Sequence, residues 1–135
     1  MSAVRFSYYA LALGWAVVIL VLTLLPAPLL PPAPQWDFFT VDSLVHALLF
    51  GVQLLLLLFG LQRDPAVRLN KRLLTGSFLA VVAFGILVEI LQGSMGLGRA
   101  ADPVDALSNS IGGVIGLGLW FLFVRRFAAG FRKSG

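Results

Sequence analysis

Residues 43–61 read SLVHALLFGVQLLLLLFGL and hold no charged residue. A helix rises about 1.5 Å per residue, so this stretch spans about 28 Å, close to the ~30 Å thickness of the hydrocarbon core of a bilayer. Gln53 is the strongly polar residue near its middle, and an amide at that depth is expected to bond a neighbouring helix. The stretch therefore predicts a transmembrane helix.

Three further apolar stretches of similar length lie on either side of it, at about residues 8–25, 73–91 and 106–124. The composition agrees with a bilayer as the solvent, because 59% of the 135 residues are hydrophobic and only 12% are charged. A soluble domain holds about a quarter charged residues. We therefore expect an all-α polytopic membrane protein, a compact bundle of four transmembrane helices that forms a single domain over residues 1–135.

The basic residues predict how this bundle is oriented. Nine of the ten fall on one side of an up-and-down arrangement, and Arg99 falls on the other. Because cytoplasmic segments carry the excess of Lys and Arg, both termini are expected in the cytoplasm. Cleavage of the first helix as a signal peptide is the alternative, although no A-x-A site follows it. The nine are Arg5, Arg63, Arg68, Lys71, Arg72, Arg125, Arg126, Arg132 and Lys133.

The segment between the first two helices is expected to be extended. Residues 26–41 hold five of the seven prolines, which disfavour a helix. Trp36, Phe38 and Phe39 follow these prolines, and aromatic rings concentrate at membrane–water interfaces. We expect this segment to lie at the interface.

The composition also excludes several classes of site. The chain has no cysteine, which excludes disulfides and thiolate chemistry, and its single histidine excludes His-rich metal sites. One histidine with carboxylates could hold a divalent cation through oxygen ligands, but nothing in the spacing requires it, so we predict no metal and no cofactor. The net charge of +4 does not indicate nucleic acid, because the charges are sorted by membrane side.

Polar residues gather at the end of the predicted bundle that lies opposite the nine basic residues. Spacings of three and four residues place each pair on one helix face. Arg99 lies in the loop between the last two helices, and arginine grips phosphate or carboxylate with two parallel hydrogen bonds. We predict that these residues form one binding pocket, in which Arg99 contacts Glu89 or an aspartate. The pairs are Asp42 with His46, Glu89 with Gln92, and Asp105 with Asn109.

These residues also have structural interpretations. Asp102, which precedes a proline, is typical of a helix N-cap, and Asp105 would then lie at the positive end of the helix dipole. Glu89 lies at the negative end of its own helix and needs a partner, for which Arg99 or His46 is suitable. A tie between Glu89 and Arg99 that holds the loop explains them as well as a ligand site does.

The glycines of the last apolar stretch indicate close packing. Gly112 and Gly116 form a G-x-x-x-G pattern, which is typical of a seam where two helix backbones approach. The same face offers a route to a homo-oligomer.

The polar residues and glycines also form one combined pattern. It contains Asp42-x-x-x-His46, Glu89-x-x-Gln92, Gly98-Arg99 and Asp105-x-x-x-Asn109-x-x-Gly112, preceded by Thr23-Leu24-Leu25-Pro26. Over residues of about 20–118 this pattern resembles the VanZ-like family of bacterial membrane proteins. The chain departs from that family at Val88, where members often have Asp, and at Ser43, where they often have a basic residue.

The resemblance implies a four-helix module in the bacterial cytoplasmic membrane. It implies no established reaction, and through the family's namesake it implies a link to low-level resistance to the glycopeptide teicoplanin. The positions that it carries over as site residues are Asp42, His46, Glu89, Gln92, Arg99, Asp105 and Asn109.

Two functions fit this sequence. The first is a binding or accessory module whose polar pocket engages an anionic envelope lipid or a lipid-linked precursor. The second is a membrane-embedded enzyme acting on such a lipid, with Glu89 or Asp42 as base and His46 as acid. A small transporter fits less well, because the helix halves toward the basic end lack the ionisable residues that a path through the membrane needs.

Overall fold

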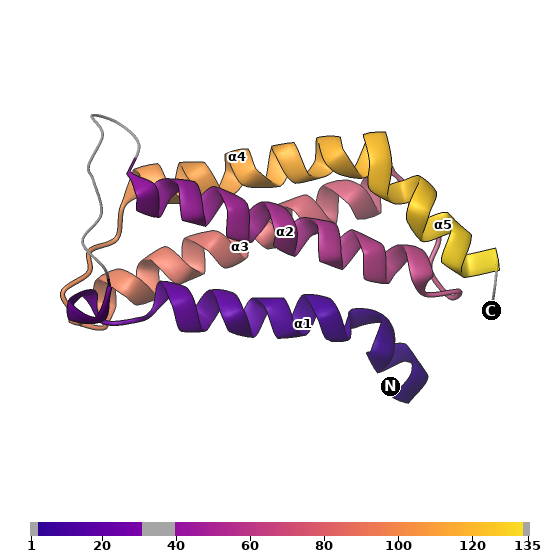
Figure 1. Cartoon of the computed structure of the whole chain (residues 1–135). Coiled ribbons are helices and arrows are strands. Elements are labelled where there is room, and N and C mark those ends of the chain that lie inside the picture. The colour runs from indigo at the N-terminus through magenta and orange to yellow at the C-terminus, as the bar shows by residue number, and fades with distance from the viewer. Residues whose placement is uncertain (1–2, 31–39, 134–135) are drawn as a thin grey trace.

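The computed structural model describes residues 3–30 and 40–133, and these form an all-α bundle (Figure 1). Four of the helices are long and apolar enough to cross a membrane, the fourth within the segment Pro103–Gly130. The predicted fold class is confirmed. In chain order the elements are α1 (Ala3–Thr23), the 3-10 turn η1 (Ala27–Leu29), α2 (Val41–Arg63), α3 (Lys71–Ser94), α4 (Pro103–Leu119), the π-helical turn η2 (Trp120–Val124) and α5 (Arg125–Lys133).

Three helices begin two or three residues before their apolar stretch because polar side chains cap them. Thr40 accepts a hydrogen bond from a backbone N–H of α2, Asn70 from one of α3 and Asp102 from one of α4. The predicted N-cap at Asp102 is confirmed. The predicted place of Trp36, Phe38 and Phe39 at the interface falls on residues 31–39, outside the described part of the chain.

The chain runs up and down, so that the start of α1, α5 and the loop between α2 and α3 lie at one end of the bundle (Figure 1). The starts of α2 and α4 and the end of α3 lie at the other. We call the first the basic end, for its lysines and arginines, and the second the acidic end, for Asp42, Glu89, Asp102 and Asp105.

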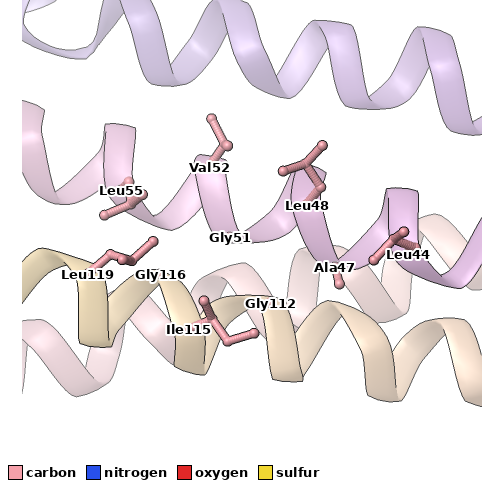
Figure 2. A pocket seen from close by; sticks show the side chains of 10 residues that line it. All are labelled: Leu44, Ala47, Leu48, Gly51, Val52, Leu55, Gly112, Ile115, Gly116 and Leu119. Carbon is pink, nitrogen blue, oxygen red and sulfur yellow. The ribbon is translucent and has the colours of Figure 1, made fainter.

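Contact between α2 and α4 depends on three glycines (Figure 2). A Cβ added to Gly112 would overlap the carbonyl group of Ala47. A Cβ on Gly116 would lie 2.7 Å from the carbonyl oxygen of Gly51, and one on Gly51 would lie 2.8 Å from that of Gly112. Side chains at these positions would force the backbones apart, which confirms the predicted seam. The seam is used inside the chain, and pairing of two copies through this face stays a prediction.

A groove follows the same seam on the outer surface of the bundle. Its volume is about 220 Å³ and its walls are almost entirely apolar. Leu44, Leu48 and Leu55 line it from α2, and Ile115 and Leu119 line it from α4 (Figure 2).

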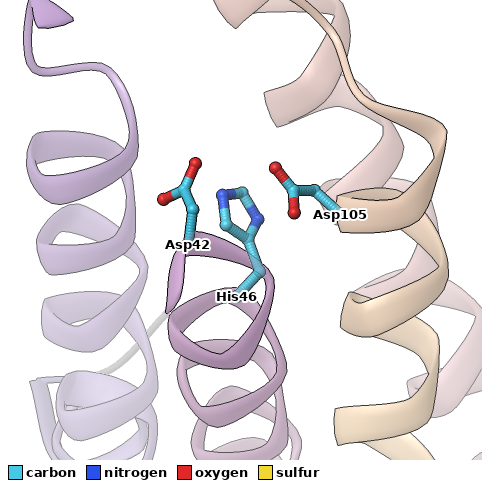
Figure 3. Close-up of side chains that lie close together, drawn as sticks. All are labelled: Asp42, His46 and Asp105. Carbon is cyan, nitrogen blue, oxygen red and sulfur yellow. The ribbon is translucent and has the colours of Figure 1, made fainter. Parts of the chain in front are cut away.

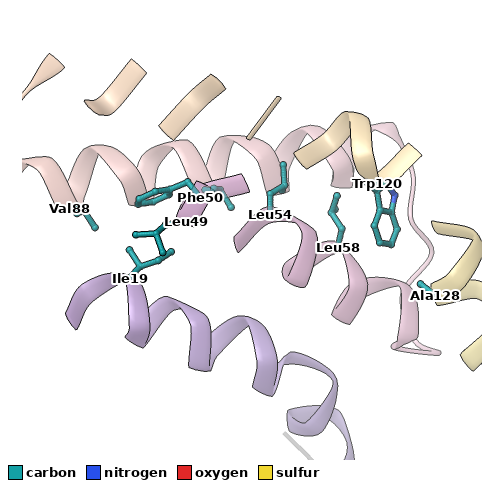
Figure 4. Packing of buried hydrophobic residues seen from close by; sticks show 9 residues of the cluster. Ile19, Leu49, Phe50, Leu54, Leu58, Val88, Trp120 and Ala128 are labelled. Atoms are coloured by element: carbon teal, nitrogen blue, oxygen red, sulfur yellow. The ribbon is translucent and has the colours of Figure 1, made fainter. Parts of the chain in front are cut away.

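The buried core is centred on α2, which contacts the other three spanning helices. Phe50, Leu54 and Leu58 are fully buried, with Ile19 of α1 and Val88 of α3 packed into the same cluster (Figure 4). Lipid tails are as apolar as leucine, so this core stabilises the bundle through close packing rather than through removal of apolar surface from water.

Two side-chain hydrogen bonds join α1 to α2 within the apolar region. Gln53 Nε2 donates to the carbonyl oxygen of Ala12 at 3.2 Å, and Trp15 Nε1 donates to that of Leu49 at 2.9 Å. The predicted bond from Gln53 to a neighbouring helix is confirmed.

The C-terminal region differs from its predicted form. The sequence suggested a helix to residue 124 and then a basic tail, but the helix passes through η2 and continues as α5, which bends toward α2 (Figure 1). Trp120 and Ala128 are buried in the core as a result. Arg125 and Arg126 lower the mean hydropathy at the start of α5. A search for apolar stretches therefore stops before this amphipathic helix.

Candidate functional site

The predicted site residues come from the starts of α2 and α4, the end of α3 and the loop between α3 and α4, which lie at the acidic end of the bundle (Figure 1). Asp42 and His46 belong to the first turns of α2, Glu89 to the last turns of α3, and Asp105 and Asn109 to the first turns of α4.

His46 joins the three helices. Its side chain is buried, its Nδ1 lies 3.1 Å from Asn109 Oδ1 and 3.3 Å from Glu89 Oε1, and its ring stacks on Phe50 one turn further along α2. Both neighbouring oxygens are acceptors, so Nδ1 is the nitrogen that carries the proton. The structure therefore brings the predicted residues of α2, α3 and α4 into direct contact.

A glycine of α3 makes room for this contact. A Cβ on Gly85 would lie 2.8 Å from Asn109 Nδ2. Gly85 precedes Glu89 by four residues, so the two share a face of α3. That face can therefore approach Asn109 closely while Glu89 meets His46.

Glu89 has two partners and neither is arginine. Its carboxylate is buried, with Oε1 beside His46 and Oε2 accepting the backbone N–H of Asp102 at 3.1 Å. The first N–H groups of a helix have no partner inside the helix. At the start of α4 the N–H of Asp102 finds its partner in the carboxylate of Glu89, at the end of α3. Of the two suggested partners His46 is correct, and a tie between Glu89 and Arg99 is not observed.

Arg99 instead pairs with Asp42, its Nη2 lying 2.6 Å from Asp42 Oδ2. The contact of Arg99 with an aspartate is confirmed. Gly96 and Gly98 precede it with φ angles of 64° and 75°, which favour glycine, and this loop conformation returns the chain toward α2. The Arg99 side chain is 9% exposed and that of Asp42 is 45% exposed, so the pair is approachable from the Asp42 side.

Sequence reasoning missed two hydroxyl residues of the site. Ser43 is buried and its Oγ donates to Asp105 Oδ1 at 2.6 Å, while Thr40 Oγ1 lies 3.2 Å from Ser43 Oγ. The signal for Thr40 was its place directly before an apolar stretch, because threonine is a preferred N-cap, whereas no local pattern indicated the contact of Ser43 with Asp105.

Gln92 has a different environment from the other predicted residues. It is buried, and its Nε2 donates to the carbonyl oxygen of Thr23 at the end of α1. Its observed contact ties α3 to α1, and its role in binding a ligand stays a prediction.

The cluster contains one group whose residue types and spacing could hold a metal ion. Ligand atoms of Asp42, His46 and Asp105 all lie within 4.8 Å of one another, and the imidazole lies between the two carboxylates (Figure 3). Among the described residues, three buried polar atoms of the cluster have no hydrogen-bond partner. They are His46 Nε2, Glu89 Oε1 and Asn109 Nδ2.

The arrangement offers both donors and acceptors to a ligand. The guanidinium group of Arg99 has five N–H donors, of which one bonds Asp42 within the described part of the chain, and Asn109 offers an amide donor there. His46 beside Glu89 could relay a proton.

Comparison with known proteins places these residues in a wider group. A protein-family model described as VanZ/LLP1 matches residues 6–124, a range that includes every predicted site residue. No curated protein and no solved structure matches the chain.

Proposed function

The chain belongs to the VanZ/LLP1 family, and from that membership we propose that it is a binding or accessory module of the cell envelope. In this proposal the polar cluster at the acidic end engages the anionic headgroup of an envelope lipid or of a lipid-linked precursor. The protein sits in the bacterial cytoplasmic membrane with both termini in the cytoplasm.

The observation that carries the proposal is an apolar groove whose lining on α2 and α4 begins one to two helical turns from the polar cluster. Residues four apart share a helix face, so Ser43 lies one turn from Ala47, which lines the groove on α2. Asp105 lies seven residues, about two turns, from Gly112, which lines it on α4. An amphiphile has the matching form, because its acyl chain fits the groove while its headgroup reaches the turn that carries Ser43 and Asp105.

Arg99 is the group we assign to the headgroup anion. Within the described residues its guanidinium makes one hydrogen bond, to Asp42, and a guanidinium can bind a phosphate and a carboxylate at the same time through different N–H groups. Asp42 is the more exposed member of the pair, so an anion approaches from that side.

Lipid retention tests the headgroup assignment. The protein is isolated in native membrane particles, and its bound lipids are identified by native mass spectrometry. The Arg99→Lys variant keeps the charge but loses the fork, so we expect it to retain less anionic lipid at unchanged thermal stability. Arg125→Lys is the matched control at the basic end. Equal retention by both variants and the wild type would contradict the proposal.

A second pair of variants tests the groove. Leu48 lines it and is 66% exposed, so Leu48→Trp fills the groove without entering the core. Leu79 of α3 is 57% exposed and lies outside the groove lining, which makes Leu79→Trp the control. We expect only Leu48→Trp to displace the lipid, and displacement by neither would remove the groove from the proposal.

An enzyme acting on such a lipid is the second candidate, favoured by one contact. His46 and Glu89 form a buried pair, which is the arrangement of a general acid and its partner. Glu89→Gln keeps the shape and an acceptor oxygen but cannot act as a base. A folded variant that still binds lipid and loses all turnover would establish the enzyme, and full function with glutamine would remove Glu89 from acid–base chemistry.

A contribution to resistance against glycopeptides of the teicoplanin type would follow from occupancy of envelope lipids. We expect the Arg99→Lys variant to lower any such resistance together with lipid retention. A change in one without the other, measured in the same strain, separates the two properties.

A further inference from the structure

One ring nitrogen of the buried histidine lacks a partner. His46 Nδ1 faces two acceptor oxygens, from Asn109 at 3.1 Å and from Glu89 at 3.3 Å, so it holds the proton of the neutral ring. Nε2 then presents a lone pair, and within the described part of the chain this buried atom receives no hydrogen bond. A buried polar atom without a partner is costly, so a ligand for Nε2 is expected.

The surroundings of that nitrogen are those of a metal ligand. A histidine that binds a metal through one nitrogen almost always donates the other N–H to a carboxylate or carbonyl oxygen, which fixes the tautomer and orients the ring. For His46 the oxygens of Glu89 and Asn109 lie beside Nδ1 and can accept this N–H. The imidazole lies between the carboxylates of Asp42 and Asp105 (Figure 3).

We propose that Asp42, His46 and Asp105 form a binding site for one divalent cation. Their ligand atoms lie within 4.8 Å of one another. Metal–ligand bonds of about 2.0–2.2 Å allow ligand atoms to be up to roughly 4.4 Å apart, so small side-chain rotations close the site. One nitrogen and two carboxylate ligands suit Zn²⁺ or Mn²⁺ better than Mg²⁺ or Ca²⁺, which prefer oxygen ligands alone.

Each carboxylate has an oxygen for the cation in addition to the contact already described. Arg99 takes Oδ2 of Asp42, and the hydroxyl of Ser43 takes Oδ1 of Asp105. These bonds orient the carboxylates and leave the other oxygen of each to turn toward His46, as hydrogen bonds to ligating carboxylates do in metal sites.

The charge of the cluster supports a cation. Among the described residues, Arg99 pairs with Asp42 and His46 lies beside Glu89, while the buried carboxylate of Asp105 contacts only the hydroxyl of Ser43 and has no ion-pair partner. Buried carboxylates without compensation are expensive. A divalent cation supplies the missing charge, and with three protein ligands it keeps coordination positions open to water or to an oxygen of a ligand.

The single histidine allows a direct test on the wild-type chain. The protein is produced without a histidine tag, labelled with ¹⁵N-histidine, stripped with a chelator in detergent and titrated with Zn²⁺. We expect the Nε2 resonance to move on binding about one equivalent while Nδ1 keeps its proton. Unchanged resonances of both nitrogens under excess Zn²⁺ would overturn the proposal.

Metal content of variants provides the second measurement. Asp105→Asn removes a ligand oxygen charge, and we expect it to weaken Zn²⁺ or Mn²⁺ binding at least about tenfold in elemental analysis after dialysis. Asp64→Asn removes an equally buried carboxylate at the basic end and should leave the metal content unchanged. Equal metal content in both variants and the wild type would place the ion elsewhere. Both readouts use the metal alone, so they do not depend on the proposed lipid.

Discussion

Arg99 Nη2 donates to Asp42 Oδ2 at 2.6 Å, although 57 residues separate the two in the chain. The pair ties the loop between α3 and α4 to the first turn of α2, at the end of the bundle where the starts of α2 and α4 meet. The same loop supplies the backbone N–H of Asp102 to Glu89. The ion pair therefore ties the loop to α2, and the backbone hydrogen bond ties it to the end of α3.

A double-mutant cycle measures the ion pair. Asp42 is half-exposed, so solvent screens the attraction, and we expect Arg99→Ala and Asp42→Ala to show a coupling energy of about 1 kcal/mol or less in detergent. The coupling should fall as salt rises. Strictly additive effects of the two substitutions at low salt would show that the contact contributes nothing to stability.

A second charged contact, at the basic end, predicts a pH dependence. Asp64 is buried, and its carboxylate accepts the backbone N–H of Ala66 at 2.9 Å, the hydroxyl of Tyr9 at 2.9 Å and the guanidinium of Arg5 at 3.3 Å. The backbone hydrogen bond from Ala66 is the largest cause that lowers the pKa of Asp64, followed by the bond from Tyr9 and the charge of Arg5.

A carboxyl whose pKa is lower in the folded than in the unfolded state stabilises the fold above the unfolded value, which is about 3.9 for aspartate. This stability is lost as the pH falls through the folded pKa of Asp64. We expect thermal unfolding curves of the wild type to shift to lower temperature as the pH falls below about 4, and the Asp64→Asn variant to lack that part of the shift. A parallel pH response of both proteins would exclude the contribution.

The glycine seam predicts opposite effects of two similar substitutions in α4. Gly112→Ala places a methyl group against the backbone carbonyl of Ala47, which cannot move without separating α2 from α4, so we expect a loss of roughly 2 kcal/mol or more. Gly118→Ala meets nothing within 4 Å and should be neutral or slightly stabilising, because alanine favours the helix. Thermal stability in detergent compares the two, and equal losses would contradict a specific seam.

The apolar stretches sufficed to predict the four spanning helices, because a bilayer requires about 20 apolar residues per crossing whatever the packing. The three- and four-residue spacings sufficed to predict that Asp42 and His46, and Asp105 and Asn109, share helix faces. The sequence predicted a carboxylate partner for Arg99 but not which one, since the choice of Asp42 depends on the turn that Gly96 and Gly98 give the loop.

The contact of Ser43 could not be predicted either, because it also depends on tertiary packing. Its partner is Asp105 of α4, and which faces of α2 and α4 meet is decided by the glycine seam further along both helices. The end of the last helix was predicted wrongly because α5 combines the buried Ala128 with charged residues. The mean hydropathy of such a mixed segment is low, so it did not indicate a continued helix.

The orientation in the membrane is the last prediction, and the absence of cysteine in the sequence makes it simple to test. Ala66 lies in the loop at the basic end and Met95 follows α3 at the acidic end, and both are exposed. Nine basic residues against one place the Ala66 loop in the cytoplasm. In intact cells an impermeant maleimide should therefore label Met95→Cys and spare Ala66→Cys until the membrane is opened. The reverse pattern would put the acidic cluster on the cytoplasmic side, where envelope precursors attached to lipid are still within its reach but extracellular glycopeptides are not.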